Sequence, residues 1–286
     1  MTKLESVLLL FLLAGCSKPE PQPIPEPPPP APIPEPQPPV PPEPVPETAC
    51  KATENRSLVR ARKVSPRIVG GHESMPGAYP WMVAIGYKTG TGTFNYCGGT
   101  LIASNWVLTA AHCQVLPGDV VTIGRHDMTT TEGVQVSVKR ALTHAEYNPA
   151  TNQNDISVVE LDRYLVSPHT VTLGEAPQQG TAKALGWGLT SEGGTPSVVL
   201  KEVDVPITPN DKCNTMYGGG ITPDMMCADD GEGASCQGDS GGALLYEGKQ
   251  AGITSFGIGC ARPEFPGVYQ RTWPHRAWIE ACIVEE

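Results

Sequence analysis

A serine stands between an acid and two glycines in the segment Gly238-Asp239-Ser240-Gly241-Gly242. A serine hydroxyl is a poor nucleophile unless a base removes its proton and a third group orients that base. Flanking glycines permit a tight turn that exposes the hydroxyl, and nearby backbone N–H groups can stabilise an oxyanion. Because the segment is also compatible with a glycine-rich hairpin turn, the other two groups must be found elsewhere in the chain.

A histidine and an aspartate occur at the ends of two apolar segments upstream. His112 follows the largely apolar segment 106–111 and precedes Cys113, and Asp155 begins an apolar segment. Taken singly, such a histidine is often structural, and such an aspartate often caps the start of a strand. Together with Ser240, the two residues supply the base and the orienting acid that acyl transfer needs.

The elements that must position these residues are short and apolar. Gly and Pro number 31 each in 286 residues, of which 39% are hydrophobic, and this composition favours a turn-rich β protein. Short apolar stretches separated by turn residues predict strands of an all-β sandwich or barrel. They cover 81–87, 100–104, 106–111, 120–124, 134–142, 156–161, 183–188, 200–207, 243–247 and 251–257. Near the end, Trp278, Ile279 and Cys282 have helical spacing and predict a closing helix.

Charge and cysteine content narrow the class of protein. The net charge of −10 argues against a nucleic-acid partner, which would call for a basic surface. Nine cysteines indicate an oxidising compartment, and the odd number implies that one of them does not pair within the chain.

The N-terminus offers a use for the odd cysteine. Lys3 precedes an apolar run at 7–14 that is too short to span a bilayer, so it indicates a signal peptide rather than a membrane anchor. A short buried helix is the alternative. The end of the run, Leu-Ala-Gly-Cys at 13–16, resembles the bacterial lipoprotein box, which implies a signal peptide at 1–15 and a lipid (palmitate) on Cys16. In that family, Ser17 favours the outer membrane, on its periplasmic or cell-surface face.

Residues 19–46 contain seventeen prolines among 28 positions. This composition predicts polyproline II, a semi-rigid spacer on the order of 80–90 Å long at about 3.1 Å per residue. A proline-motif ligand for a partner is the alternative. We therefore expect a lipid anchor and linker at 16–48, followed at 49–67 by a basic, protease-accessible segment.

The remainder of the chain, 68–286, resembles the chymotrypsin/trypsin family of serine proteases. Six of the family's segments appear in its order: RIVGG at 67–71, TAAHC at 109–113, DISVVEL at 155–161, GWG at 186–188, CQGDSGG at 236–242 and PGVY at 266–269. The resemblance implies a serine endopeptidase acting on proteins or peptides without a cofactor. It also implies two six-stranded antiparallel β-barrels with a C-terminal helix.

Site residues follow from the same resemblance. It makes His112 the general base and acid, Asp155 its orienting partner and Ser240 the nucleophile, with an oxyanion hole formed by the N–H groups of Gly238 and Ser240. The two barrels would meet at the cleft, with His112 and Asp155 in the first and Ser240 in the second.

The segment at 67–71 resembles the family's activation site. Cleavage between Arg67 and Ile68 would create an α-amino group that pairs with Asp239, which makes the full chain a zymogen. A plain strand entry is the alternative reading of this segment. The uncharged Ala234 makes self-cleavage after arginine poor, so we expect a separate activating protease.

The resemblance also pairs the cysteines as Cys97–Cys113, Cys213–Cys227 and Cys236–Cys260. Cys50 and Cys282 remain, and elimination pairs them, in keeping with family members whose propeptide stays tethered by a disulfide.

Specificity depends on four positions that the resemblance assigns to the primary pocket: Ala234 at its base, the adjacent Ser235, and Gly257 and Gly267 at its walls. Without an acid at the base, an open slot favours large apolar residues before the scissile bond. Arg262 and Glu264 are expected to be exposed loop charges.

The resemblance leaves two further expectations and one competing interpretation. Arg125 lies in a short loop where calcium-binding relatives are acidic, so we expect no metal. We also expect a monomer. The competing interpretation is a catalytically quiet surface binding or adhesion module on a protease fold.

Overall fold

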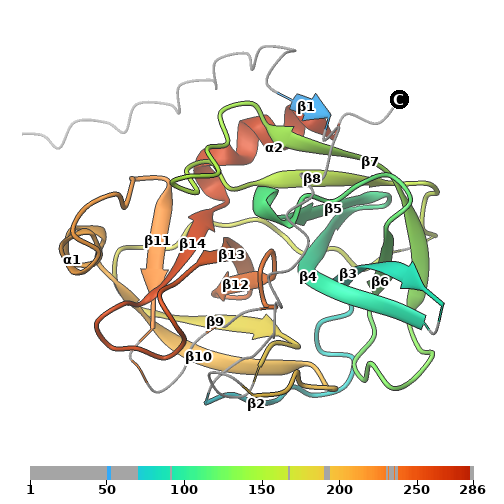
Figure 1. The fold of residues 1–286 in the computed structure, drawn as a ribbon, viewed down its shortest axis with the longest axis horizontal. Coiled ribbons are helices and arrows are strands. Elements are labelled where there is room, and N and C mark those ends of the chain that lie inside the picture. Colours follow the sequence, from blue (N-terminus) through green and yellow to red (C-terminus); the bar gives the residue numbers. More distant parts are fainter. Residues whose placement is uncertain are drawn as a thin grey trace, which may run out of the picture. The chain divides into compact units, whose positions relative to one another are not determined.

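The computed structural model describes residues 50–52, 70–90, 92–166, 168–189, 194–229, 231, 235 and 238–283. Its first sheet closes on itself in the order β7-β6-β3-β4-β5-β8, with β7 also pairing with β8, and forms barrel 1 (Figure 1). The strands are β3 (Met82–Thr89), β4 (Gly92–Ala103), β5 (Trp106–Thr109), β6 (Val120–Ile123), β7 (Val134–His144) and β8 (Ser157–Leu161).

The second sheet closes in the order β11-β14-β13-β12-β9-β10, with β10 also pairing with β11, and forms barrel 2. Its strands are β9 (Thr181–Gly186), β10 (Lys201–Thr208), β11 (Met225–Ala228), β12 (Ala243–Tyr246), β13 (Lys249–Phe256) and β14 (Gly267–Arg271). All strand pairs are antiparallel. The predicted pair of six-stranded antiparallel barrels is therefore confirmed.

Each barrel carries one further short strand that the apolar pattern did not predict. β1 (Cys50–Ala52) pairs with the end of β7, and β2 (His72–Glu73) pairs with the start of β10. β2 belongs to the segment that leads into barrel 1, yet it pairs with barrel 2. The entry of the domain therefore links the two barrels.

Helices are short and few in the described part of the chain. They are the 3₁₀ helices η2 (Ala111–Cys113) and η3 (Trp273–His275) and the α-helices α1 (Asn210–Met216) and α2 (Arg276–Cys282). The predicted closing helix is confirmed as α2, whose Trp278, Ile279 and Cys282 are buried. These three side chains join the apolar core of barrel 1 although α2 follows barrel 2 in the chain. None of the helices that the structure describes is long and apolar enough to cross a membrane.

The pairing of β5 with β8 positions the first half of the site. Thr109 at the end of β5 lies opposite Ser157 at the start of β8. His112 follows β5 by three residues, and Asp155 precedes β8 by two. Because both strands are fully buried, their register is fixed by the core, and the two side chains meet at one end of barrel 1.

Candidate active site

His112 and Asp155 form a close pair at that end of barrel 1. The Nδ1 atom of His112 lies 2.7 Å from Oδ2 of Asp155, and the backbone N–H of His112 donates to Oδ1 at 2.8 Å. The Asp155 side chain is fully buried, whereas that of His112 is 25% exposed. A two-point contact of this kind fixes the ring plane and the tautomer of the histidine and leaves its Nε2 available.

The pair is electrostatically polarised. Burial opposes the charge on His112, but the Asp155 carboxylate outweighs it and raises the pKa of the imidazole above its ordinary value. Burial also opposes the charge on Asp155. The charge and hydrogen bonds of His112, together with a hydrogen bond from Ser255, nevertheless lower the pKa of this carboxyl. Asp155 therefore stays ionised and can stabilise an imidazolium at His112.

Ser255, on β13 of barrel 2, is part of this arrangement and was not predicted. Its Oγ donates to Oδ2 of Asp155 at 2.5 Å, and its side chain is buried. The sequence placed Ser255 in an apolar strand, but only the meeting of the two barrels shows what its hydroxyl contacts.

Ser240 reaches the same place from barrel 2. Its carbonyl accepts from the N–H of Gly98 at 2.7 Å and lies 3.8 Å from Sγ of Cys113, the residue after His112. Gly241 next to it has a φ of +79°, and a Cβ there would lie 2.2 Å from Oγ1 of Thr109. The serine turn is thus pressed against the strand end that carries His112, which explains why the turn needs glycine.

Asp239 is buried beside the serine. Its Oδ1 accepts from the N–H of Gly188 at 2.8 Å, and the residue is 1% exposed. A Cβ on Gly186 or Gly188 would lie within 2.1 Å of this carboxylate, so both glycines are required for its placement. The Gly-Trp-Gly segment of the sequence is therefore the wall of the Asp239 site.

The predicted walls of the specificity pocket face one another. A Cβ on Gly257 would lie 3.9 Å from Cα of Gly267 and would have no closer neighbour than the Gly259 carbonyl at 3.6 Å. Ser235 lies on the same side, since its Oγ is 2.7 Å from the hydroxyl of the buried Tyr269. Gly267 also lies against the Tyr269 ring and Ser235, since a Cβ there would be 3.5 Å from Cε2 of Tyr269 and 3.6 Å from Oγ of Ser235.

The loop charges near this slot lie outside it. Arg262 and Glu264 are both exposed, as expected from the sequence. The Arg262 guanidinium lies over Gly259, where a Cβ would be 2.2 Å from its Nε.

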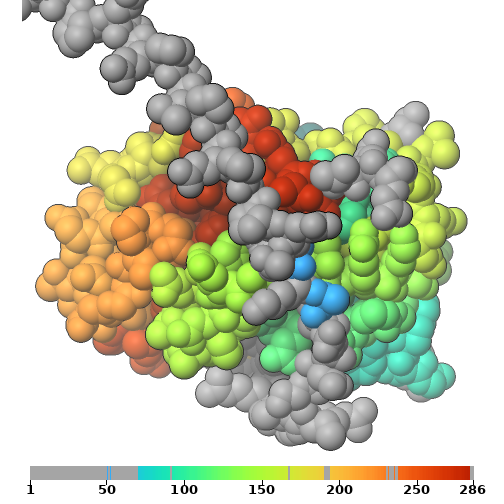
Figure 2. Space-filling view, turned by 90° about the horizontal axis from the view of Figure 1, so that it is seen from above, coloured from blue at the N-terminus to red at the C-terminus, as the bar shows by residue number. Residues whose placement is uncertain are grey.

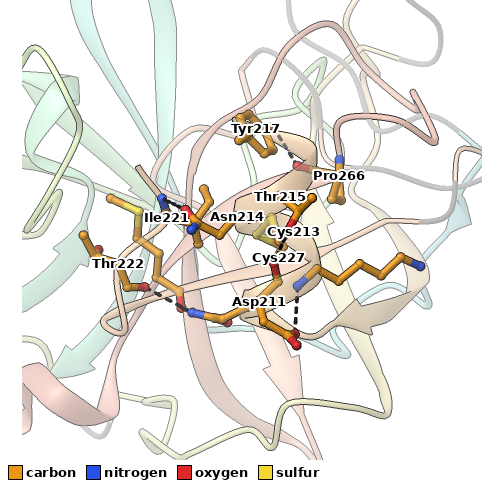
Figure 3. Close-up of a disulfide and its surroundings, with 12 residues drawn as sticks. Asp211, Cys213, Asn214, Thr215, Tyr217, Ile221, Thr222, Cys227 and Pro266 are labelled. Atoms are coloured by element: carbon orange, nitrogen blue, oxygen red, sulfur yellow. Dashed lines mark hydrogen bonds between the residues drawn. A yellow bond between two sulfur atoms is a disulfide. The ribbon is translucent and has the colours of Figure 1, made fainter. Parts of the chain in front are cut away.

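A disulfide between Cys213 and Cys227 ties α1 to β11 and supports the outer side of the slot (Figure 3). Tyr217, just after α1, donates its hydroxyl to the Pro266 carbonyl at 2.8 Å. Its ring also packs edge-on against Phe256 and Phe265. These contacts join α1 to the strand that carries Gly267.

Two further disulfides belong to barrel 1. Cys97–Cys113 links β4 to η2 beside His112, and Cys50–Cys282 links β1 to α2. Figure 2 shows the blue residues of β1 on the surface next to α2, in red. The sulfurs of Cys97 and Cys113 lie within 4.8 Å of a ring nitrogen of His112, but because they are bonded to each other they are not metal ligands.

Several predicted site residues lie outside the part of the chain that the structure describes. Cys260 is disulfide-bonded, but its predicted partner lies outside the described residues. The predicted site residues that lie outside the described residues are Cys16, Arg67, Ile68, Ala234 and Cys236, and the predicted signal peptide and proline-rich linker also lie outside them.

Comparisons with known proteins agree on one family. The family model described as Trypsin matches residues 68–279. The trypsin of Saccharopolyspora erythraea is 40% identical over 214 residues, which is 71% of this chain and 92% of that protein. The trypsin of Squalus acanthias is 36% identical over 227 residues, which is 76% of this chain and 96% of that protein. Serine protease filzig of Drosophila melanogaster is 38% identical over 262 residues, or 82% of this chain, and the match spans 16% of that protein's length.

Proposed function

The chain belongs to the trypsin family of serine endopeptidases, and we propose that His112, Asp155 and Ser240 are its catalytic triad. The observation that carries the assignment is the 2.7 Å contact between His112 and the buried, ionised Asp155, beside a glycine turn that holds Ser240. These contacts support a base that is oriented by an acid and lies near a hydroxyl nucleophile.

Each residue has one task. His112 accepts the Ser240 proton at Nε2 as the hydroxyl attacks the substrate carbonyl, and it later returns that proton to the leaving amine. Asp155 holds the imidazole in the required tautomer and stabilises its charged form. The N–H groups of Gly238 and Ser240 receive the oxyanion, and water then hydrolyses the acyl-enzyme.

A fluorophosphonate probe distinguishes this function from a quiet binding module, because only an assembled triad activates the serine. Protein activated by trypsin and then freed of it should label with one probe per chain and cleave casein. Ser240→Ala should remove the label, whereas Ser197→Ala, a change of a buried serine in the connection between β9 and β10, should retain it. Activated protein that neither labels nor cleaves would favour the binding module.

The protease is made as a zymogen that is switched on at Arg67–Ile68. The support is Asp239, a carboxylate buried beside Ser240 in a pocket walled by two glycines, where a new α-amino group would find an acceptor. Arg67→Gln should block activation by added trypsin, and Arg62→Gln should not. N-terminal sequencing of the activated wild type should begin at Ile68, and full activity of Arg67→Gln would contradict this mode of activation.

The primary pocket prefers large apolar residues before the scissile bond. Ala234 offers no charge to a buried ammonium or guanidinium, and Gly257 and Gly267 carry no side chain that could close the slot. Apolar burial contributes about 25 cal/mol per Å2, which favours Phe, Tyr, Leu or Met over Ala. Matched peptides ending in Phe, Leu, Ala and Arg test this by kcat/KM. A preference for Arg would contradict it and direct attention to the exposed Glu264.

A lipid on Cys16 anchors the enzyme to the outer membrane through the proline-rich stalk. The support is the lipoprotein box at 13–16 and the absence of a use for this cysteine among the predicted pairs. Cys16→Ser should release the protein from membranes and abolish incorporation of labelled fatty acid. Continued membrane association of that variant, with no acylation of the wild type, would contradict the anchor.

A further inference from the structure

Two glutamines are completely buried where the barrels meet. Gln250 on β13 and Gln270 on β14 both belong to barrel 2, and each is 0% exposed. Oε1 of Gln250 accepts from the Thr100 hydroxyl of barrel 1 at 2.7 Å. Gln270 instead reaches Asp155. A buried amide is costly unless its hydrogen bonds are made, so the partners of each glutamine indicate what it is for.

The Gln270 amide has a defined orientation. Its Oε1 accepts from the backbone N–H of Asp155 at 3.0 Å, and a backbone N–H can only donate. The amide nitrogen therefore points the other way. It lies 2.8 Å from the Asp224 carbonyl, 3.0 Å from Oδ2 of Asp224 and 2.8 Å from Nε2 of His275.

Asp224 and His275 hold the amide in place. Burial raises the pKa of Asp224, but the hydrogen bonds that its carboxylate accepts, among them the one from Gln270, lower it to well below the usual carboxyl range, so the residue is an ionised acceptor. Because an amide nitrogen only donates, His275 accepts through Nε2, which places its own proton on Nδ1. With acceptors on one side and the Asp155 N–H on the other, rotation of the amide would break every one of these bonds.

Asp155 needs such a partner because the chain around it is irregular. Asn152 and Asn154 have φ values of 55° and 54°, in the left-handed region that costs non-glycine residues energy. Regular pairing of β8 begins only at Ser157. The Asp155 N–H is therefore buried but lies ahead of the hydrogen-bonded pairing of β8 with β5. Its acceptor is instead a side chain, that of Gln270.

From these contacts we infer that Gln270 is a positioning residue for catalysis, one that sets the angle of Asp155 toward His112 by holding the Asp155 backbone. Ser255 donates a hydrogen bond to the carboxylate of the same residue, so barrel 2 contacts Asp155 at both its backbone and its side chain. The inference rests on the proposed triad, because orienting Asp155 matters for turnover only if His112 is the base.

Gln250 supplies a matched control. It has the same side chain, the same complete burial and a hydrogen bond across the same interface, but its barrel 1 partner is Thr100 rather than a triad residue. If glutamines here only stabilise the barrel interface, Gln270→Met and Gln250→Met should have similar consequences. If Gln270 positions Asp155, only Gln270→Met should change the chemistry.

The experiment compares activated wild type, Gln270→Met and Gln250→Met, with every rate divided by the concentration of titrated active sites. We expect kcat of Gln270→Met to fall about ten- to a hundredfold with KM within about twofold, because a misdirected general base slows chemistry more than binding. The acidic limb of its kcat/KM profile should move to lower pH, since a displaced Asp155 supports the imidazolium less well. Gln250→Met should lose thermal stability but keep kcat and the pH profile of the wild type.

Equal kcat per titrated site in all three proteins would overturn the inference while leaving the triad intact. An inactive, unlabelled wild type would instead overturn the proposed function itself. If Gln270→Met does not fold, Gln270→Asn and Gln250→Asn replace the pair, because the shorter amide keeps its polarity but lacks the reach to Asp155. A lower kcat in Gln270→Asn alone supports the inference, and equal kcat in both overturns it.

Discussion

The two barrels contribute to the site by different physical means. Barrel 1 supplies charge, because His112 and the buried Asp155 polarise each other across 2.7 Å. Barrel 2 supplies shape, because Ser240 sits in a turn whose glycines touch Thr109 and Gly98. Electrostatic interactions weaken gradually with distance, whereas repulsion between atoms 2–3 Å apart, the distances that an added Cβ would have here, changes abruptly. Substitutions in the first half should therefore change protonation and rate, and those in the second should disrupt geometry.

The largest effect should come from removing the charge of barrel 1. Asp155→Asn keeps the shape of the side chain but takes away the carboxylate that orients His112. We expect kcat to fall about 10⁴-fold, the general magnitude for Ser-His-Asp triads, with the fold retained. Rates on a peptide substrate and the circular dichroism spectrum measure the two parts of this prediction.

Asp119→Asn is the control for that change. Asp119 is a buried acid of the same barrel that accepts from the Tyr96 hydroxyl and the Leu116 N–H, away from His112. We expect it to lose stability but not kcat. Equal losses of kcat in both variants would mean that the removal of any buried negative charge from barrel 1 lowers the rate, and would contradict an orienting role for Asp155.

The next largest effect should come from adding volume in barrel 2. In Gly241→Ala, the new Cβ would lie 2.2 Å from Oγ1 of Thr109 and 2.5 Å from the Gly98 carbonyl, both on barrel 1. The serine turn must move away, and we expect kcat to fall by at least about a hundredfold. Active-site titration should show a smaller reactive fraction.

Gly248→Ala separates this steric effect from backbone strain. Gly248 has nearly the same φ, +76°, but nothing lies within 4 Å of the position a Cβ would take. Its substitution should cost roughly 1–2 kcal/mol of stability from the left-handed conformation alone, without loss of kcat. A catalytic loss as large as that of Gly241→Ala would show that strain, rather than contact between the barrels, governs the turn.

The two barrels also differ in how well their strands could be predicted from the sequence. The strands of barrel 1, except for the first eight residues of β4, and the helix at the end of the chain were identifiable, because apolar stretches and the spacing of Trp278, Ile279 and Cys282 indicate burial directly. β11 (Met225–Ala228) and β14 (Gly267–Arg271) were not singled out as strands. β11 contains only Met, Cys and Ala, and β14 has just Val268 and Tyr269 between a glycine and two polar residues, so their pairing with each other and with β10 and β13 makes them strands.

Contacts across the barrel interface were the other gap. Ser255 and Gln270 lie 100 and 115 residues after Asp155, and no local pattern connects them to it. Both are polar residues on predicted or observed strands that turn out to be buried. A polar side chain in an apolar stretch is thus the one available signal, and its partner has to come from the fold.

The pH dependence offers a third way to sharpen the comparison. With His112 as the proposed general base, activity requires its neutral form, so kcat/KM should fall with decreasing pH as this residue binds a proton. Because Asp155 raises the pKa of His112, the midpoint should lie above the ordinary histidine value of about 6.5. The half-buried His144 should behave in the opposite way, since burial and the nearby His275 lower its pKa.

Whether the midpoint of the pH profile lies above or below the ordinary histidine pKa therefore shows which histidine is responsible. A midpoint above about 6.5 that His144→Gln leaves in place would assign the limb to His112 and hence to the charge of barrel 1. A midpoint below that value that disappears in His144→Gln would assign it to the other histidine.

The smallest catalytic effect should come from the disulfide that joins β1 to α2. Its two cysteines are 232 positions apart, so in the uncut chain it closes a long loop and can stabilise the fold by up to about 5 kcal/mol. After cleavage at Arg67–Ile68 it would only connect two chains. Cys50→Ser with Cys282→Ser should therefore lower the Tm of the uncut protein but leave kcat of the cleaved enzyme unchanged.

The same pair of changes tests what holds the propeptide. Without the disulfide, β1 retains three residue pairs with β7, which are too few to hold it in place. The cleaved propeptide should therefore separate from the protease domain in gel filtration without reductant. The matched variant is Cys97→Ala with Cys113→Ala, which removes the disulfide beside His112. We expect that variant to lose kcat about tenfold, because the loop that carries the base is no longer fixed to β4. Equal kcat in the two double variants would show that neither disulfide orients barrel 1, and that packing alone holds His112 against the serine turn.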